Sequence, residues 1–419
     1  MYKKDLQYYK FCLYGFLKNL RFFEPFLYLF FLEKGLSFLQ IGALITVREI
    51  TRNVLEIPTG ILADVMGRRR TMIFAFVFYI LSFFIFYIST VYWLFIVAML
   101  FFSFGDAFRT GTHKAMIFEY LKIKGWGNQK VFYYGHTRSW SQMGSAISSL
   151  LAAFIVFYSG SYRFIFLFST IPYIFDLGLM ITYPKELDGE IQVFEGRKVK
   201  DNFRKVMKEV VHSFRDVRLF KAISNISVYS GFFRAVKDYL QPILNTFVLA
   251  LPVYFVWTRE QTSAMVIGGV YFIIYFLTSY ASRKSGKISE KFKGLTRPLN
   301  LSLLVGLLFG LLSGIFYKQD ISVMAVLSIM IFIGIYLIEN IRKPMGIAYV
   351  TELLNENILA TALSTESQVK SVYAALLAPL IGLLADVFGI GIALLLVSAL
   401  LLVLAPLFWL KRRTTPSSA

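Results

Sequence analysis

The sequence predicts an all-α membrane protein with twelve transmembrane helices. Of its 419 residues, 57% are hydrophobic and only 16% are charged, whereas about a quarter of the residues in a soluble globular protein are charged. So few charges cannot cover the surface of a water-soluble protein of this size. The apolar residues gather in stretches of about 20 residues, the length that crosses a bilayer as an α-helix.

Twelve apolar stretches follow one another along the chain. They cover roughly residues 11–32, 39–63, 70–89, 92–116, 134–158, 162–183, 222–249, 265–283, 298–317, 322–344, 362–385 and 389–410. Most connections are short, but segment 184–221 is long and highly charged. We interpret it as a cytoplasmic linker between an N-terminal six-helix bundle, 1–183, and a C-terminal one, 222–419. No small-residue cleavage site follows the first stretch, so it is interpreted as an uncleaved helix.

Basic residues near the helix ends predict the orientation. The side that holds the N-terminus also receives most of segment 184–221 and three basic clusters: Arg68, Arg69 and Arg70; Lys122, Lys124 and Lys130; Lys411, Arg412 and Arg413. Cytoplasmic loops carry an excess of Lys and Arg. Both termini are therefore predicted to be cytoplasmic, in the inner membrane of the cell. The net charge of +19 then indicates contact with anionic lipid rather than with nucleic acid.

The motifs of common enzymes are missing from the sequence. The single cysteine, Cys12, excludes an intrachain disulfide and a cysteine-based metal site. The three histidines are not in a zinc-binding arrangement, and neither a phosphate-binding loop nor a nucleophile elbow is present. We therefore expect no enzymatic activity, no metal and no cofactor, and we expect a monomer.

Ionisable residues inside the apolar spans are the candidates for function. Each costs about 2.5–3.5 kcal/mol at a helix centre, so each should face a partner or a water-filled cavity. They recur at steps of three and four residues, which places them on one helix face. The candidates for substrate binding are Arg21, Arg52, Arg109, Arg234, Lys237 and Gln241; those for proton coupling are Glu24, Glu56, Asp106 and Asp238. In the alternative interpretation, these charges pair with one another and only fasten the helices together.

The aromatic residues are numerous, with 43 Phe among them. We expect most of them to face lipid. The exceptions are four tyrosines that are candidates to line a pocket: Tyr14, Tyr28, Tyr271 and Tyr275.

Four short segments recur in the same order in the two halves, at offsets of about 217 to 229 residues. One pair is Glu24-Pro25 and Gln241-Pro242, and another is Ser141-Gln142 and Ser367-Gln368. Two related sets of six helices would enclose a cavity between them.

The second span is followed by Gly60-Ile61-Leu62-Ala63-Asp64-Val65-Met66-Gly67-Arg68-Arg69-Arg70. This run resembles the G-x-L-a-D-r-x-G-r-k signature of the major facilitator superfamily, from which it departs at Val65. The resemblance, with the helix count and the linker, covers essentially the whole chain. It implies two six-helix bundles with alternating access to a central site that helices one, four, seven and ten line. A similar run, Gly382–Gly389, lacks the trailing arginines and is interpreted as a turn.

The signature residues Gly60, Asp64, Gly67 and Arg68 are candidates for a cytoplasmic gate. The glycines allow a tight turn and close helix approach. Asp64 would accept hydrogen bonds from a facing helix N-terminus, and Arg68 would pair with a carboxylate.

The predicted function is secondary active transport of a small organic solute, anionic or zwitterionic, coupled to protons. Basic groups slightly outnumber acidic groups near mid-membrane, and an anionic solute would complete the pairing. The expected partners are this solute, protons and membrane lipid. Two alternatives stay open: a proton-antiporting exporter of amphiphilic drugs, and a non-transporting membrane sensor on the same fold.

Overall fold

The computed structural model describes residues 4–126, 130–189, 191, 217–251, 257–292, 294–318, 323–353 and 356–410. Within these ranges the regular structure is α-helix with short 3-10 segments, and no strand occurs. Nine stretches of these ranges, each a helix or two successive helices, are long and apolar enough to cross a membrane. The predicted all-α membrane fold is confirmed. Most of segment 184–221 lies outside the described residues, as do Lys411, Arg412 and Arg413.

The chain divides into two compact units. Unit 1 comprises Met1–Leu36, Thr46–Phe203 and Pro252–Tyr275, and unit 2 comprises Ser37–Ile45, Arg204–Leu251 and Phe276–Ala419. Two long helices, α3 (Phe38–Met66) and α12 (Arg259–Lys291), begin in one unit and end in the other. The predicted boundary at the linker stays a prediction.

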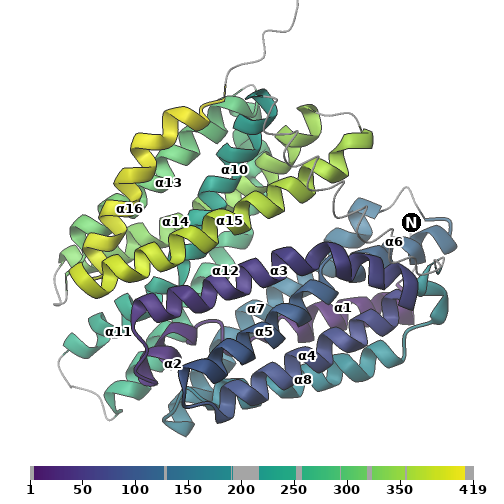
Figure 1. Cartoon of the computed structure of the whole chain (residues 1–419), viewed down its shortest axis with the longest axis horizontal. Helices are drawn as coiled ribbons and strands as arrows, with labels where there is room; N and C mark the ends of the chain where they lie inside the picture. The colour runs from purple at the N-terminus through teal and green to yellow at the C-terminus, as the bar shows by residue number, and fades with distance from the viewer. Residues whose placement is uncertain are drawn as a thin grey trace, which may run out of the picture. The chain divides into compact units, whose positions relative to one another are not determined.

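Apart from parts of α3 and α12, unit 1 is built from helices of the first half of the chain. They are α1 (Leu6–Lys18), α2 (Leu27–Glu33), α4 (Arg68–Ile88), α5 (Tyr92–Arg109), α6 (Thr112–Ile123), α7 (Lys130–Ser159) and α8 (Phe164–Ile181), followed by the 3-10 helix η2 (Lys185–Asp188). Helix α4 packs against α5 and α8, and α1 packs against α7 and α8 (Figure 1). This packing brings α1, the α5–α6 junction and α7 to one site.

Two predicted spans of unit 1 are broken. Stretch 11–32 forms α1 and α2 with turns between them, because Pro25 lacks an N–H and disfavours helical geometry in the residue before it. Stretch 92–116 is interrupted after Arg109: Thr110 is extended and Gly111 has φ +80°. Only glycine adopts such an angle without steric cost. The expectation of single helices was wrong at both places.

Aromatic rings form much of the core of unit 1, contrary to the expectation that most of them face lipid. Phe23 and Phe86 stack on Phe166, and Phe30 meets Phe166 edge to face. All four rings are buried. The many phenylalanines therefore hold these helices together, because aromatic pairs add a specific geometry to the area they bury.

Unit 2 holds the helices of the second half. They are α10 (Val217–Val236), η3 (Lys237–Tyr239), α11 (Leu240–Ala250), α13 (Thr296–Phe316), α14 (Val323–Leu353), α15 (Glu356–Phe388), α16 (Ile390–Leu404) and η4 (Ala405–Phe408). Helix α10 packs against α15, and α13 packs against α14 and α16 (Figure 1). Predicted span 222–249 is interrupted by η3, where the Tyr336 hydroxyl donates to the Lys237 carbonyl at 2.6 Å.

The run Gly382–Gly389 is not a turn, because α15 continues to Phe388. The Asp386 carboxylate accepts hydrogen bonds from the backbone N–H groups of Phe38 and Leu39, each at 2.8 Å. It therefore caps the first turn of α3, whose N–H groups have no partner within the helix. A side chain at Gly382 would clash with the backbone at Phe38 and Leu39, so glycine permits this close approach.

Candidate functional site

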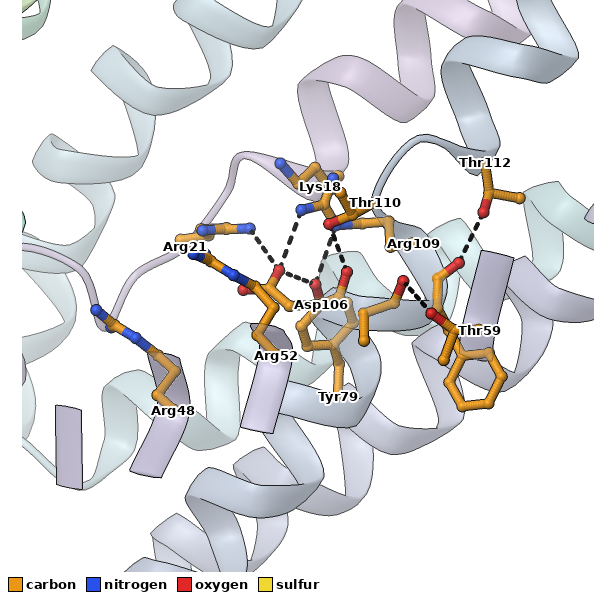
Figure 2. Close-up of polar contacts among 12 residues, drawn as sticks. Lys18, Arg21, Arg48, Arg52, Thr59, Tyr79, Asp106, Arg109, Thr110 and Thr112 are labelled. Atoms are coloured by element: carbon orange, nitrogen blue, oxygen red, sulfur yellow. Dashed lines mark hydrogen bonds and ion pairs between the residues drawn. The ribbon is translucent and has the colours of Figure 1, made fainter. Parts of the chain in front are cut away.

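Asp106, on the last turn of α5, is the centre of a polar cluster in unit 1 (Figure 2). Its Oδ1 accepts a hydrogen bond from Arg109 Nη2 at 3.0 Å and lies 3.9 Å from Arg21 Nη2. The Tyr79 hydroxyl on α4 donates to the same oxygen and accepts from Arg109 Nε at 3.0 Å. Three segments are thus joined at one carboxylate, which is nearly buried.

The end of α5 holds Arg109 in place. Thr110 Oγ1 donates to the Asp106 carbonyl at 2.7 Å, and Thr112 Oγ1 donates to the Phe108 carbonyl at 2.8 Å. The Asp106 carbonyl also accepts from the Thr110 N–H at 2.9 Å, so both the backbone and the side chain of Thr110 bind it. Side-chain hydroxyls thus supply hydrogen bonds to the last carbonyl groups of a helix, which have fewer N–H partners than those in its middle.

Helix α3 adds a second charged group beside this cluster (Figure 2). Glu49 is buried and pairs with Arg48 at 3.2 Å and with Arg52 at 2.6 Å. About two turns further, Thr59 Oγ1 donates to the Ala107 carbonyl of α5 at 3.1 Å. Ser103 Oγ of α5 donates to the Arg48 carbonyl at 3.3 Å, so α3 contacts α5 at both places.

A cavity of about 360 Å³ opens beside Arg109, within unit 1. Its lining residues come from α1, the α5–α6 region and α7: Phe11, Tyr14, Gly15, Lys18, Asn19, Arg109, Gly111, His113, Lys114, Ile117, Tyr134, Thr137, Arg138, Ser141 and Gln142. Four of them are basic (Lys18, Arg109, Lys114 and Arg138), and no carboxylate is among them. This volume suits a small organic molecule. Most of these residues belong to three of the predicted apolar stretches, 11–32, 92–116 and 134–158.

Lys18 differs from the other cations of this region. It is partly buried at the end of α1, beside Arg109 (Figure 2). Its ammonium group makes no hydrogen bond or ion pair with any residue that the structure describes. Its neighbour Tyr14 stacks on His113 with ring centroids 3.5 Å apart. Of the four tyrosines expected at a pocket, Tyr14 lines this cavity and the other three do not.

The substrate candidates of the second half lie in unit 2. Arg234 Nη1 donates to Ser371 Oγ at 3.3 Å, and Lys237 pairs with Asp238 at 2.7 Å. Gln241 Nε2 lies 3.4 Å from Asp238 Oδ1. Asp238 and Gln241 are both buried. Asp238, the candidate for proton coupling in the second half of the chain, therefore has Lys237 and the Gln241 amide as its neighbours.

The remaining proton candidates lie in unit 1. Glu24 is in the turn after α1, where it accepts a hydrogen bond from the Tyr275 hydroxyl at 3.4 Å. Glu56 is on α3, one turn after Arg52. Neither lines the cavity. Of the ten candidates for substrate binding or proton coupling, only Arg109 lines the cavity. Position in an apolar span therefore does not tell which charged side chains face the cavity; their burial and their bonding partners do.

The signature motif lies at the end of α3 and the start of α4. Arg68 pairs with Glu119 at 3.3 Å, as expected of it. Gly67 has φ +89°, the conformation of a tight turn, whereas no described residue would contact a side chain at Gly60. Asp64 is exposed and makes no hydrogen bond within the described ranges, so its gating role stays a prediction.

Asp176, on α8, was not among the candidates. It is fully buried, and neither carboxylate oxygen has a hydrogen-bond partner among the described residues. A single acidic residue within the apolar stretch 162–183 is visible in the sequence, and that signal was sufficient to find it. Its lack of a partner is a property of the packed structure alone.

The comparisons agree with the fold. The sequence matches the profile of the Major Facilitator Superfamily over residues 12–364. No match was found among the curated proteins. A mutant of the nucleoside transporter NupG shares 14% identity at a TM-score of 0.76, over 96% of this chain and 98% of that chain.

Two further solved structures are similar. A POT family transporter in complex with 5-aminolevulinic acid has 13% identity and a TM-score of 0.68, over 95% of this chain and 93% of that one. The peptide transporter POT in complex with sulfate has 15% identity and a TM-score of 0.67, over 96% and 94%. At such low identity these likenesses show the fold alone. The profile match spans most of the sequence, and the chain therefore belongs to the Major Facilitator Superfamily.

Proposed function

We propose that this protein is a secondary active transporter that moves a small organic anion or zwitterion across the membrane by alternating access, coupled to protons. The observation that carries the proposal is the cavity of unit 1, which four basic side chains and no carboxylate line. A cation placed there would meet only like charge, whereas an anion would receive charge-assisted hydrogen bonds.

The contacts of Arg109 and Lys18 suit two different tasks in binding. Asp106 and Tyr79 hold the Arg109 guanidinium in one orientation, so little side-chain entropy is lost when a solute arrives. The Lys18 ammonium makes no hydrogen bond or ion pair within the described residues, so it is available to an anionic group. The stacked pair of Tyr14 and His113 gives an apolar surface for the body of the solute.

The similar solved structures are compatible with this solute class. They include transporters of nucleosides and of peptides, and POT structures that contain sulfate and 5-aminolevulinic acid. The proposal extends to an integral protein of the inner membrane with both termini in the cytoplasm, acting as a monomer. It assigns no enzymatic step and no cofactor.

A binding screen with matched solutes tests the proposal. Each set shares one small framework that bears a carboxylate, a carboxamide or an amine, for example benzoate, benzamide and benzylamine. The melting temperature of the purified protein in detergent is measured with each solute. A solute that binds the folded state raises this temperature, and we expect such rises from carboxylates and from the corresponding amino acids.

The matched control is Lys18→Met, which removes a cavity cation that makes no internal bond. The carboxylate-induced rise should shrink in this variant. If amines raise the melting temperature more than carboxylates across the sets, the anion assignment is wrong, and the drug-exporter alternative gains support.

A further inference from the structure

Asp176 has the burial of a core residue and the chemistry of a proton carrier. Its exposed fraction is 0%, and both carboxylate oxygens lack a hydrogen-bond donor among the described residues. An ionised carboxylate in such a position would be strongly destabilising, whereas a neutral carboxyl group is tolerated. Asp106, Glu49 and Asp238 differ, since each pairs with a cation at 3.0 Å or less.

The elements packed against α8 are α1, α4 and α7. From α1, Lys18 and Tyr14 interact electrostatically with Asp176. From α4 comes Tyr79, which contacts the ring of Tyr173, one turn before Asp176. The described titratable groups of α7 include Arg138, which is exposed and lines the cavity.

Two groups complete the surroundings of this carboxyl. Tyr183, just beyond α8, also interacts electrostatically with Asp176, and its hydroxyl lies 3.2 Å from His113 Nε2. Within the described residues, Lys18 is the charged side chain that acts on the Asp176 carboxyl. Lys18 also lines the cavity, so one ammonium group connects the cavity to the buried carboxyl.

Among the charged groups that act on Lys18, the ionisation of Asp176 decides whether the sum is zero. Two arginines, Arg21 and Arg109, and two carboxylates, Asp106 and Glu24, act on Lys18. With Lys18 itself they sum to +1, and an ionised Asp176 brings the sum to zero. When Asp176 carries a proton, one positive charge is left over, which one anionic group of a solute neutralises.

We propose that Asp176 carries the coupling proton of this transporter and that Lys18 links it to the solute, an inference that rests on the proposed function. A proton from water adds to a carboxylate oxygen of Asp176, and the Lys18 ammonium then takes the anionic group of the solute. When the solute leaves, Lys18 turns to Asp176, whose O–H bond breaks and returns the proton to water. One proton accompanies each negative charge.

Infrared spectroscopy of the full-length protein in lipid vesicles tests this directly, with no solute needed. A protonated carboxyl group has a C=O stretching band apart from the carboxylate bands. We expect the wild-type protein to show such a band at neutral pH, Asp176→Asn to lose it, and Asp106→Asn to keep it. Asp176→Glu, which retains a carboxyl group, should shift the band. A wild-type band that survives in Asp176→Asn overturns the assignment.

Lys18→Met tests the link between the two groups. Without the nearby ammonium, the band should persist to higher pH than in the wild-type protein. An unchanged pH dependence in a variant with wild-type size-exclusion behaviour overturns the coupling through Lys18. Both spectroscopic results could agree with a protonated Asp176 while carboxylates fail to bind in the melting screen. The proposed function would then be wrong and the protonated Asp176 would still be correct, so the two failures are distinguishable.

Discussion

At the scale of single residues, Arg109 and Lys18 line the same cavity but are held differently. Arg109 donates to Asp106 and Tyr79, whereas the Lys18 ammonium makes no hydrogen bond within the described residues. Both were visible in the sequence as basic residues on polar stripes of apolar spans. Asp106, three residues before Arg109, was a visible partner at helical spacing. Tyr79 was not, because it comes from α4 and helix packing decides that contact. The buried state of Asp176 has the same origin.

Arg109→Gln should mainly destabilise the protein. The Asp106 carboxylate would keep Tyr79 and the more distant Arg21, but would lose its closest cation. Removing one partner of a buried hydrogen-bonded group costs about 1–3 kcal/mol, so the melting temperature in detergent should fall. Arg109→Lys, which keeps the charge, is the control and should recover part of the loss. A wild-type melting temperature in Arg109→Gln would show that Asp106 does not depend on this contact.

Lys18→Met should reduce the affinity for the solute without destabilising the protein, the opposite of what is expected for Arg109→Gln. A desolvated ammonium without an internal partner does not stabilise the fold, so the melting temperature should stay unchanged or rise. The affinity for an anionic solute should fall about tenfold or more, since a hydrogen bond to a charged group contributes about 1.5–3 kcal/mol. Lys114→Met, at an exposed lining position, should change affinity less. Equal losses in the two variants would argue against a special role for Lys18 in binding.

At the scale of secondary structure, the apolar stretches located the nine described spans that are long and apolar enough to cross a membrane, but misplaced several of their ends. The window 265–283 belongs to α12, which runs from Arg259 to Lys291, because helices continue into polar residues beyond the hydrocarbon layer. The helix breaks near Pro25 and Gly111 lie within apolar stretches. Hydropathy alone does not detect such breaks. The cap formed by Asp386 joins segments 347 and 348 residues apart, so no local pattern predicts it.

Asp386→Ala should loosen the start of α3. Loss of an N-cap side chain costs about 0.5–2 kcal/mol, and here one carboxylate serves two N–H groups. Hydrogen exchange at the amides of Phe38 and Leu39 should become faster, while the end of the same helix should be unaffected. Asp64→Ala is the matched control, since Asp64 is an exposed aspartate of the similar run and makes no hydrogen bond within the described ranges. Unchanged exchange in Asp386→Ala would refute the cap.

At the scale of the whole molecule, one motif and a count of apolar spans identified the superfamily. The run from Gly60 to Arg70 and the family profile over residues 12–364 lead to the same fold. The solute class is not encoded in that motif, because it depends on which side chains line the cavity. Helices α3 and α12 each have residues in both units, whereas the predicted division into sequential halves assigned each helix to one half.

The predicted orientation is testable by thiol labelling of intact cells. The native Cys12 is buried, so background labelling should be low. A cysteine placed at Lys200 or Arg413 should resist an impermeant reagent added outside, because both positions are predicted to be cytoplasmic. A cysteine at Arg163 should react, because this position lies at the start of the sixth predicted span and therefore on the side opposite the N-terminus. Efficient external labelling at Lys200 or Arg413 would reverse the topology.

The most direct test of proton-coupled anion transport is flux into proteoliposomes under an imposed pH gradient. The carboxylate that gives the largest rise in melting temperature is supplied outside, with the lumen more alkaline than the external buffer. We predict that it accumulates above its external concentration, that a protonophore abolishes the accumulation, and that Asp176→Asn equilibrates it without accumulation. Uptake that ignores both the gradient and the protonophore would contradict proton coupling, and the absence of any protein-dependent flux of a bound carboxylate would contradict transport itself.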